Sequence, residues 1–185
     1  MKAVIIGGGV IGGGWAARFL LNGWDVSVFD TDKGAVRKIN DALDNARHSL
    51  PFLSDAPLPE EGLLTFADTM QEAVEGAVWI QESVPERLEN KHDVFAHIQS
   101  LCASDAIIAS STSGFKPSEL RAGVDRPEQI IVAHPYNPVY LLPVVEIVGG
   151  DDDVNGGVAH HAAELLSAIG MKPVILAVSY THLTL

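Results

Sequence analysis

The sequence predicts an α/β domain with a doubly wound, mostly parallel sheet and helices on both faces. The first reason is that short apolar runs alternate with amphipathic runs of helical length, in the order strand, helix, strand. The second is a glycine-rich turn directly after the first apolar run, where a helix is expected to begin. Together these observations predict a Rossmann-type fold, which binds nucleotides beyond the carboxyl ends of its strands.

The expected elements follow this alternation along the chain. Apolar runs predict strands at Ala3–Ile6, Asp25–Phe29, Leu64–Phe66, Val78–Glu82, Ala106–Ser110, Ile130–His134 and Val144–Val148. Helical periodicity predicts helices at Val10–Asn22, Lys33–Leu50, Glu86–Leu101, Pro117–Ala122 and Val154–Ile169. The interval from Pro51 to Gly62 is rich in proline, which excludes a regular helix or a central strand, so a surface loop is expected there.

Composition narrows the classes of function. A chain of 185 residues with 47% hydrophobic and 19% charged content fits one globular domain, without an apolar run of membrane-spanning length. A net charge of −12 disfavours nucleic acid and anionic membranes as partners. The N-terminal apolar stretch is too short for a signal peptide, so a cytoplasmic location is expected. The single cysteine, Cys102, excludes an internal disulfide and is expected to be a buried structural thiol.

A dinucleotide-binding fingerprint occupies the first strand-to-helix turn. Gly7, Gly9 and Gly12 match the spacing G-x-G-x-x-G directly after the strand. In this motif the first glycine permits the tight turn, the second lets backbone amides approach a pyrophosphate, and the third allows close helix packing. Asp30 ends the second strand, where a carboxylate accepts hydrogen bonds from ribose hydroxyls and repels a 2′-phosphate. The sequence therefore predicts NAD as the cofactor in preference to NADP.

A single imidazole and a single carboxylate stand at the two ends of the apolar segment from His134 to Glu146. Histidine titrates near neutral pH and can take the proton of an alcohol, while a carboxylate on its far ring nitrogen would fix its tautomer. The pair is therefore a candidate acid/base dyad. The segment alone also fits a histidine at a strand end and an exposed glutamate on the next strand.

Three polar clusters fall at predicted strand ends, at residues 82–86, 110–114 and 134–137. An alcohol dehydrogenase needs a base and a hydrogen-bond donor beside the nicotinamide, and His134 and Ser113 are the available pair. Asn137 could contact the nicotinamide or the histidine loop, although an asparagine before a proline is also an ordinary turn residue. For Ser111 and Thr112 a helix-capping role competes with a cofactor contact.

These motifs together resemble the 3-hydroxyacyl-CoA dehydrogenase family over roughly residues 2–176. The resemblance implies that His134 and Glu146 form the catalytic dyad, that Ser113 holds the substrate hydroxyl and that Asn137 belongs to the catalytic set. It also implies NAD contacts at Glu86, Lys91 and Ser111.

Within the family, residues 79–87, 110–114 and 133–143 are most similar to the members that oxidise L-carnitine. The resemblance therefore implies oxidation of the carnitine 3-hydroxyl to 3-dehydrocarnitine with reduction of NAD. A quaternary ammonium substrate could lie on the aromatic face of Tyr136 or Tyr140 by cation–π attraction, although core packing also explains both tyrosines.

The family continues into a helical domain that completes the substrate cleft and usually forms a homodimer. Residues 1–177 are therefore expected to be the NAD-binding domain, and residues 178–185 an atypical tail at a truncated or non-native end. Such a fragment is expected to bind NAD with little or no turnover. No metal site is expected, since the run from Asp151 to Asp153 has a simpler role at the positive N-terminus of a helix.

Two other readings of the function remain open. One is a different small-molecule substrate, either a 3-hydroxyacyl-CoA or L-gulonate. The other is a non-catalytic nucleotide-binding protein, because the family also resembles a lens crystallin. The presence of His134, Glu146 and Ser113 disfavours a loss of catalysis.

Overall fold

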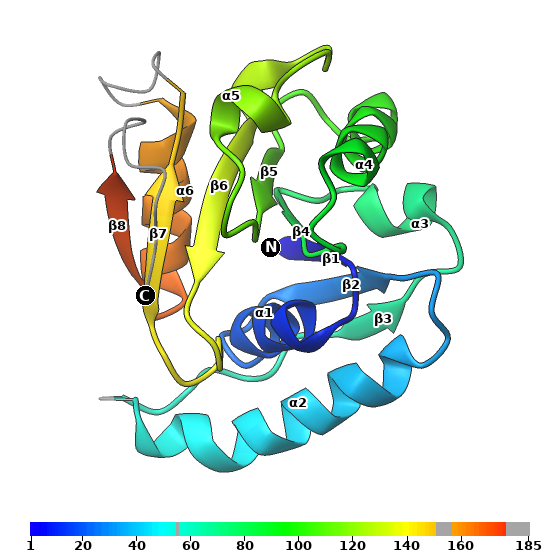
Figure 1. Cartoon of the computed structure of the whole chain (residues 1–185). Coiled ribbons are helices and arrows are strands. Elements are labelled where there is room, and N and C mark those ends of the chain that lie inside the picture. The colour runs from blue at the N-terminus through cyan, green and yellow to red at the C-terminus, as the bar shows by residue number, and fades with distance from the viewer. Residues whose placement is uncertain (55, 151–156, 177–185) are drawn as a thin grey trace.

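An eight-stranded sheet forms the centre of the computed structural model, which describes residues 1–54, 56–150 and 157–176 (Figure 1). The strands are β1 (Lys2–Ile6), β2 (Asp25–Phe29), β3 (Leu64–Phe66), β4 (Trp79–Glu82), β5 (Ile107–Ser110), β6 (Ile130–Pro135), β7 (Val144–Val148) and β8 (Lys172–Leu176). The helices are α1 (Val10–Leu20), α2 (Ala35–Ser49), α3 (Met70–Val74), α4 (Leu88–Leu101), α5 (Pro117–Leu120) and α6 (Val158–Ala168), with 3₁₀ turns η1 (Leu50–Phe52) and η2 (Pro127–Gln129).

The strand order across the sheet is β3-β2-β1-β4-β5-β6-β7-β8. Neighbouring strands from β3 to β6 are parallel, whereas β7 is antiparallel to β6 and β8 is parallel to β7. The predicted doubly wound, mostly parallel sheet is confirmed. Because β2 and β4 lie on opposite sides of β1, the winding reverses at β1, which is where open α/β sheets bind dinucleotides.

The structure adds an α-helix, α3, and a strand, β8, that the sequence pattern did not predict. Helix α3 is too short to show helical periodicity, but Thr69 and Glu72 form a capping box at its start. Strand β8 pairs with β7 and forms one edge of the sheet. Helix α4 begins at Leu88 and not at Glu86, so Glu86 remains in the loop after β4. The aspartate run at 151–153 and the tail at 178–185 lie outside the described residues.

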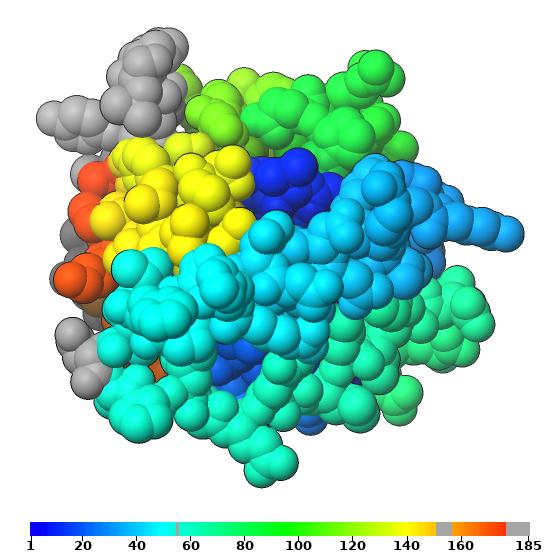
Figure 2. All heavy atoms as spheres, turned by 90° about the horizontal axis from the view of Figure 1, so that it is seen from below, coloured from blue at the N-terminus to red at the C-terminus, as the bar shows by residue number. Residues whose placement is uncertain are grey.

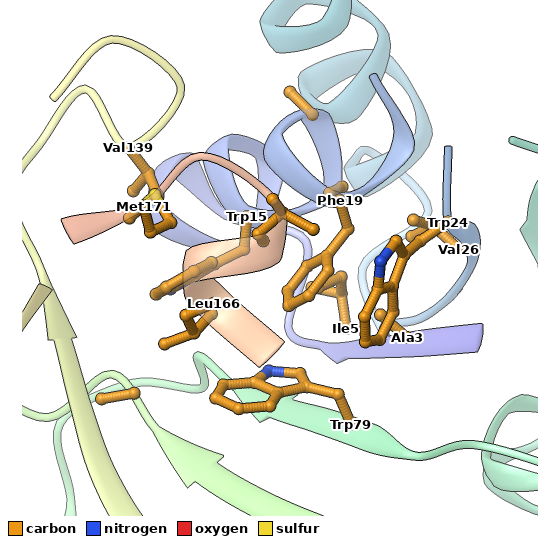
Figure 3. Close-up of a cluster of buried hydrophobic side chains, with 14 of the residues drawn as sticks. Ala3, Ile5, Trp15, Phe19, Trp24, Val26, Trp79, Val139, Leu166 and Met171 are labelled. Atoms are coloured by element: carbon orange, nitrogen blue, oxygen red, sulfur yellow. The ribbon is translucent and has the colours of Figure 1, made fainter. Parts of the chain in front are cut away.

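Each face of the sheet packs against its own set of helices. Alternate strand residues such as Ala3 and Ile5 face α1, α2 and α6, while Val4 and Ile6 face α3, α4 and α5. On the first face an aromatic cluster joins α1 to the sheet (Figure 3). The Phe19 ring centroid lies 5.8 Å from that of Trp15 and 5.8 Å from that of Trp79. This packing fixes the helix whose N-terminus carries the glycine motif.

Helix α2 lies outside α1, as the view from below shows (Figure 2). In that view α2 and the chain that follows it cover much of the visible face. The segment around residue 140, in yellow, lies next to them. Among the described residues, no helix combines the length and the apolar character that crossing a bilayer requires.

Candidate functional site

The glycine turn joins β1 to α1. Gly7 has a φ of +100° and its N–H donates to the carbonyl of Phe29 at 3.0 Å, so it turns the chain sharply beside β2. A Cβ on Gly12 would lie 1.9 Å from the carbonyl oxygen of Gly7, whereas a Cβ on Gly9 would meet nothing within 4 Å. Gly12 therefore allows the helix to pack against the turn, and Gly9 keeps the approach to the turn open.

A cavity of about 830 Å³ extends from this turn along the carboxyl ends of the strands. Its walls include Gly7, Gly9, Asp30 and Ser83. The N-terminus of α1 adds backbone N–H groups without helical partners, which suit the negative charge of a pyrophosphate. These features fit NAD.

Asp30 stands after β2 at one end of this cavity. One carboxylate oxygen accepts from the N–H of Gly8 at 2.6 Å and the other accepts from the N–H of Asp32 at 2.7 Å. A carboxylate has about four acceptor positions, so capacity remains for ribose hydroxyls. Nearby, Lys38 is paired with Asp32 at 2.8 Å. Asp30 thus both shapes the glycine turn and offers acceptors at the predicted adenosine end.

A buried ion pair lies beneath the loops that follow β4 and β5. Lys91 Nζ contacts the two carboxylate oxygens of Glu82 at 2.8 and 3.0 Å, and these side chains are 1% and 0% exposed. Glu82 also accepts from the Ser110 hydroxyl at 2.5 Å. The same ammonium lies 3.2 Å from Glu86 Oε2. Lys91, a predicted NAD contact, is therefore buried in the protein interior. Its ammonium is paired with Glu86, whose side chain is partly exposed.

Glu86 links the loop after β4 to the loop after β5. Its Oε1 accepts hydrogen bonds from the Thr112 hydroxyl and from the N–H groups of Ser113 and Gly114, at 3.1 and 3.3 Å for the last two. Partial burial opposes ionisation, but the Thr112 hydrogen bond and the Lys91 charge outweigh it and lower the pKa of Glu86. The ionised carboxylate fixes the backbone that carries Ser113.

Ser113 and His134 follow neighbouring strands. Strand β5 pairs with β6 in parallel, with Ser110 opposite Val132. Both segments therefore leave the sheet at the same edge, where Ser113 is exposed and His134 is half-buried. Both residues thus lie at one edge of the sheet, and their service in one site stays a prediction.

The predicted dyad is formed by direct pairing of β6 with β7. His134 lies opposite Glu146 in the antiparallel register, and opposite residues project from the same face. His134 Nδ1 lies 3.0 Å from Glu146 Oε2, and Glu146 is 9% exposed. Because a carboxylate only accepts hydrogen bonds, Nδ1 is the donor in this contact, and Nε2 is the ring nitrogen on the side away from Glu146.

Tyr136 completes the surroundings of this dyad. Its hydroxyl donates to Glu146 Oε1 at 3.1 Å, and its ring stands edge-on to His134 with centroids 5.7 Å apart. The hydrogen bond to Glu146 raises the pKa of the Tyr136 phenol, so the donor keeps its proton at neutral pH. Both oxygens of Glu146 are thus engaged. Tyr140, the other aromatic candidate, packs against the core.

The segment at 136–143 between the dyad strands rests on α1. Val139 is fully buried, and a Cβ on Gly14 would lie 2.8 Å from the Val139 Cβ. Gly14 therefore permits the close approach of this segment to the helix. Asn137 is exposed, and within the described ranges it forms no side-chain hydrogen bond that would tie it to His134.

The sequence alone did not predict that Glu82 pairs with Lys91 or that the Tyr136 hydroxyl donates to Glu146. A charged residue at the end of a strand that begins with Trp79 and Ile80 was the available signal for Glu82. Tyr136 offered no signal, since its hydrogen bond depends on the pairing of β6 with β7. No group of residues suited to holding a metal ion occurs in the part of the chain that the structure describes.

Known proteins similar to this chain are dehydrogenases. The family model for the 3-hydroxyacyl-CoA dehydrogenase NAD-binding domain matches residues 2–179. A protein of Ruegeria pomeroyi named L-carnitine dehydrogenase/betainyl-CoA thioesterase is 60% identical over 92% of this chain and 35% of its own length. An L-carnitine dehydrogenase of Mesorhizobium japonicum is 52% identical over 95% of this chain and 48% of its own length. The chain thus spans between a third and a half of these relatives.

Solved structures show the same fold. A 5-formyl-3-hydroxy-2-methylpyridine 4-carboxylic acid 5-dehydrogenase, described as an NAD⁺-dependent dismutase, matches with a TM-score of 0.87 and 30% identity, over 98% of this chain and 59% of its own. A 3-hydroxybutyryl-CoA dehydrogenase of Escherichia coli matches with a TM-score of 0.80 and 22% identity, over 98% of this chain and 39% of its own. The second likeness bears on the fold alone.

Proposed function

The chain belongs to the 3-hydroxyacyl-CoA dehydrogenase family, and from this premise we propose that it provides the NAD-binding and acid/base part of an L-carnitine 3-dehydrogenase. The observation that carries the proposal is the contact between His134 Nδ1 and Glu146 Oε2 at 3.0 Å. The names of relatives at 60% and 52% identity support carnitine as the substrate.

The proposed reaction converts the 3-hydroxyl of carnitine to a ketone. His134 Nε2 takes the hydroxyl proton, and the carboxylate of Glu146, on the other side of the ring, stabilises the imidazolium that results. Ser113 holds the substrate oxygen, and Asn137 lines the same rim. NAD, when bound, accepts the hydride that leaves the carbinol carbon. The C–H and O–H bonds break as the C=O bond forms, so one proton and one hydride leave the substrate.

The proposed cofactor contacts lie at the glycine turn, at Asp30 and on the loops after β4 and β5. The glycine turn receives the pyrophosphate, Asp30 receives the adenosine ribose, and Glu86 and Ser111 receive the nicotinamide half. Lys91 supports this end by holding Glu86 in place, because its ammonium is buried between Glu82 and Glu86.

The substrate is tested by supplying NAD and one candidate substrate at a time to the protein that carries this domain. L-carnitine, 3-hydroxybutyryl-CoA and L-gulonate are compared by the absorbance of NADH. We expect NADH to form with L-carnitine. Formation with either other compound and none with carnitine would reject the proposed substrate, while NADH titration shows separately whether the cofactor binds.

Replacing Tyr136 with phenylalanine is expected to reduce kcat by about 10- to 150-fold, because a hydrogen bond to a charged group contributes about 1.5–3 kcal/mol. The ring and its contact with His134 remain, and only the bond to Glu146 Oε1 is lost. The KM for NAD should stay unchanged. Steady-state kinetics measure both constants.

Tyr140→Phe is the matched control, since it removes a hydroxyl from the same segment without touching the dyad. An equal loss of kcat in both variants would show that Tyr136 does not act through Glu146.

A further inference from the structure

A chain of polar side chains runs through the core to the rim of the cavity. The indole N–H of Trp79 donates to Gln81 Oε1 at 3.0 Å, and both residues are fully buried. Gln81 Nε2 donates to Ser111 Oγ at 2.9 Å. Ser111 Oγ lies 2.8 Å from Ser83 Oγ. The chain thus connects β4 with the loop after β5.

The direction of these hydrogen bonds follows from the chemistry of the indole. Trp79 can only donate, so the Gln81 atom that faces it is the carbonyl oxygen. The amide nitrogen then points to Ser111, whose oxygen must accept. Trp79 therefore sets the orientation of the Gln81 amide from within the core.

The hydroxyl groups of Ser83 and Ser111 together carry two hydrogens. Each hydroxyl carries one hydrogen, and one of these two is used in the bond between Ser83 and Ser111. The other has no acceptor among the residues that the structure describes. The pair therefore has one hydrogen-bond donor to offer to a ligand.

Ser83 is the member of the pair that lines the cavity of about 830 Å³. Its N–H donates to the carbonyl of Ile6 at 2.8 Å, and its own carbonyl oxygen lies 2.7 Å from the position of a Cβ on Gly7. Ser83 thus sits directly against the glycine turn, on the side of β1 away from Asp30.

The order of strands identifies which part of a dinucleotide lies beside Ser83. Across the sheet, Asp30 follows β2, Gly7 follows β1, Ser83 follows β4 and Ser111 follows β5, and these strands are consecutive neighbours. With the adenosine ribose at Asp30 and the pyrophosphate at the glycine turn, the next group along NAD is the nicotinamide ribose. That ribose offers oxygen acceptors.

We propose that Ser83 is a cofactor-binding residue whose hydroxyl donates to an oxygen of the nicotinamide ribose. Ser111 donates to Ser83, and the Gln81 amide, oriented by Trp79, holds Ser111 in the position to do so. The inference rests on the NAD site and is independent of the identity of the substrate.

The test uses ADP-ribose, which contains the second ribose, and ADP, which ends at the pyrophosphate. Calorimetric titration of the Ser83→Ala variant should show a Kd for ADP-ribose raised about two- to tenfold, the range expected for loss of one neutral hydrogen bond. The Kd for ADP should stay within about twofold of the unchanged protein, the scatter expected when no hydrogen bond is lost. Ser83→Thr keeps the hydroxyl and should restore ADP-ribose binding.

Ser167→Ala is the control, because the Ser167 hydroxyl is exposed and, among the described residues, bonds only to the Ala163 carbonyl of its own helix. An unchanged Kd for ADP-ribose in Ser83→Ala would overturn the proposal. An equal loss for ADP and ADP-ribose would also overturn it, since Ser83 would then act on the glycine turn. Carnitine plays no part in this titration, so either result would leave the proposed substrate unaffected.

Discussion

Replacing His134 with glutamine is expected to lower kcat for alcohol oxidation by about 10²- to 10⁴-fold, the range for loss of a general base. Glutamine keeps polarity and approximate size but cannot take a proton at neutral pH. The backbone of β6 and the glycine turn are untouched, so the Kd for NADH should change little. Initial rates of NADH formation and a fluorescence titration of NADH measure the two quantities.

The matched control for this variant is His160→Gln, on the exposed side of α6. This substitution should leave kcat unchanged. A His134→Gln variant that retained most of its turnover would show that another group removes the proton, and that the dyad is only a structural pair.

Replacing Gly12 with alanine is expected to cause a large loss of folding stability and of NADH binding. In Gly12→Ala the new methyl would lie 1.9 Å from the Gly7 carbonyl oxygen and 3.0 Å from Ile5 Cγ2. Because the first of these atoms belongs to the backbone, the turn or the helix must move. We expect the free energy of unfolding to fall by about 3 kcal/mol, at the upper end of overpacking costs, with loss of NADH binding. Chemical denaturation and fluorescence titration provide the measurements.

Gly9→Ala separates binding from folding within the same motif. A Cβ at Gly9 meets nothing within 4 Å, and its φ of −75° suits alanine, so the free energy of unfolding should change little. The methyl would still obstruct the pyrophosphate, so NADH binding should weaken about tenfold or more. If Gly12→Ala were as stable as the unchanged protein, or if Gly9→Ala bound NADH normally, the assigned roles of these glycines would be wrong.

The sequence predicts the sheet well, because apolar strands and amphipathic helices carry their periodicity locally. It does not predict β8, which depends on pairing with β7, or α3, which is too short for a repeat to appear. The same distinction applies to the site. The glycine spacing is local, whereas the burial of Lys91 between Glu82 and Glu86 arises only when α4 packs behind β4.

Hydrogen bonds between residues far apart in the chain cannot be predicted from the sequence pattern either. Glu86 and Thr112 are 26 residues apart, and Gln81 and Ser111 are 30 apart. Each pair meets because β4 and β5 are neighbours and end together. A family resemblance identifies some of these positions, but the direction of a hydrogen bond depends on three-dimensional neighbours.

The antiparallel register of β6 and β7 determines which residues of this hairpin can be substituted without moving His134 relative to Glu146. His134 and Glu146 are 12 residues apart along the chain, yet the pairing of β6 with β7 places them opposite each other. The intervening segment is held to α1 at Val139, and its exposed members include Asn137 and Leu142. Those exposed positions can be exchanged, by selection or by engineering, without altering the contact between His134 and Glu146. The proposed acid/base pair and the exposed part of the segment that joins its two strands are therefore separable parts of one hairpin.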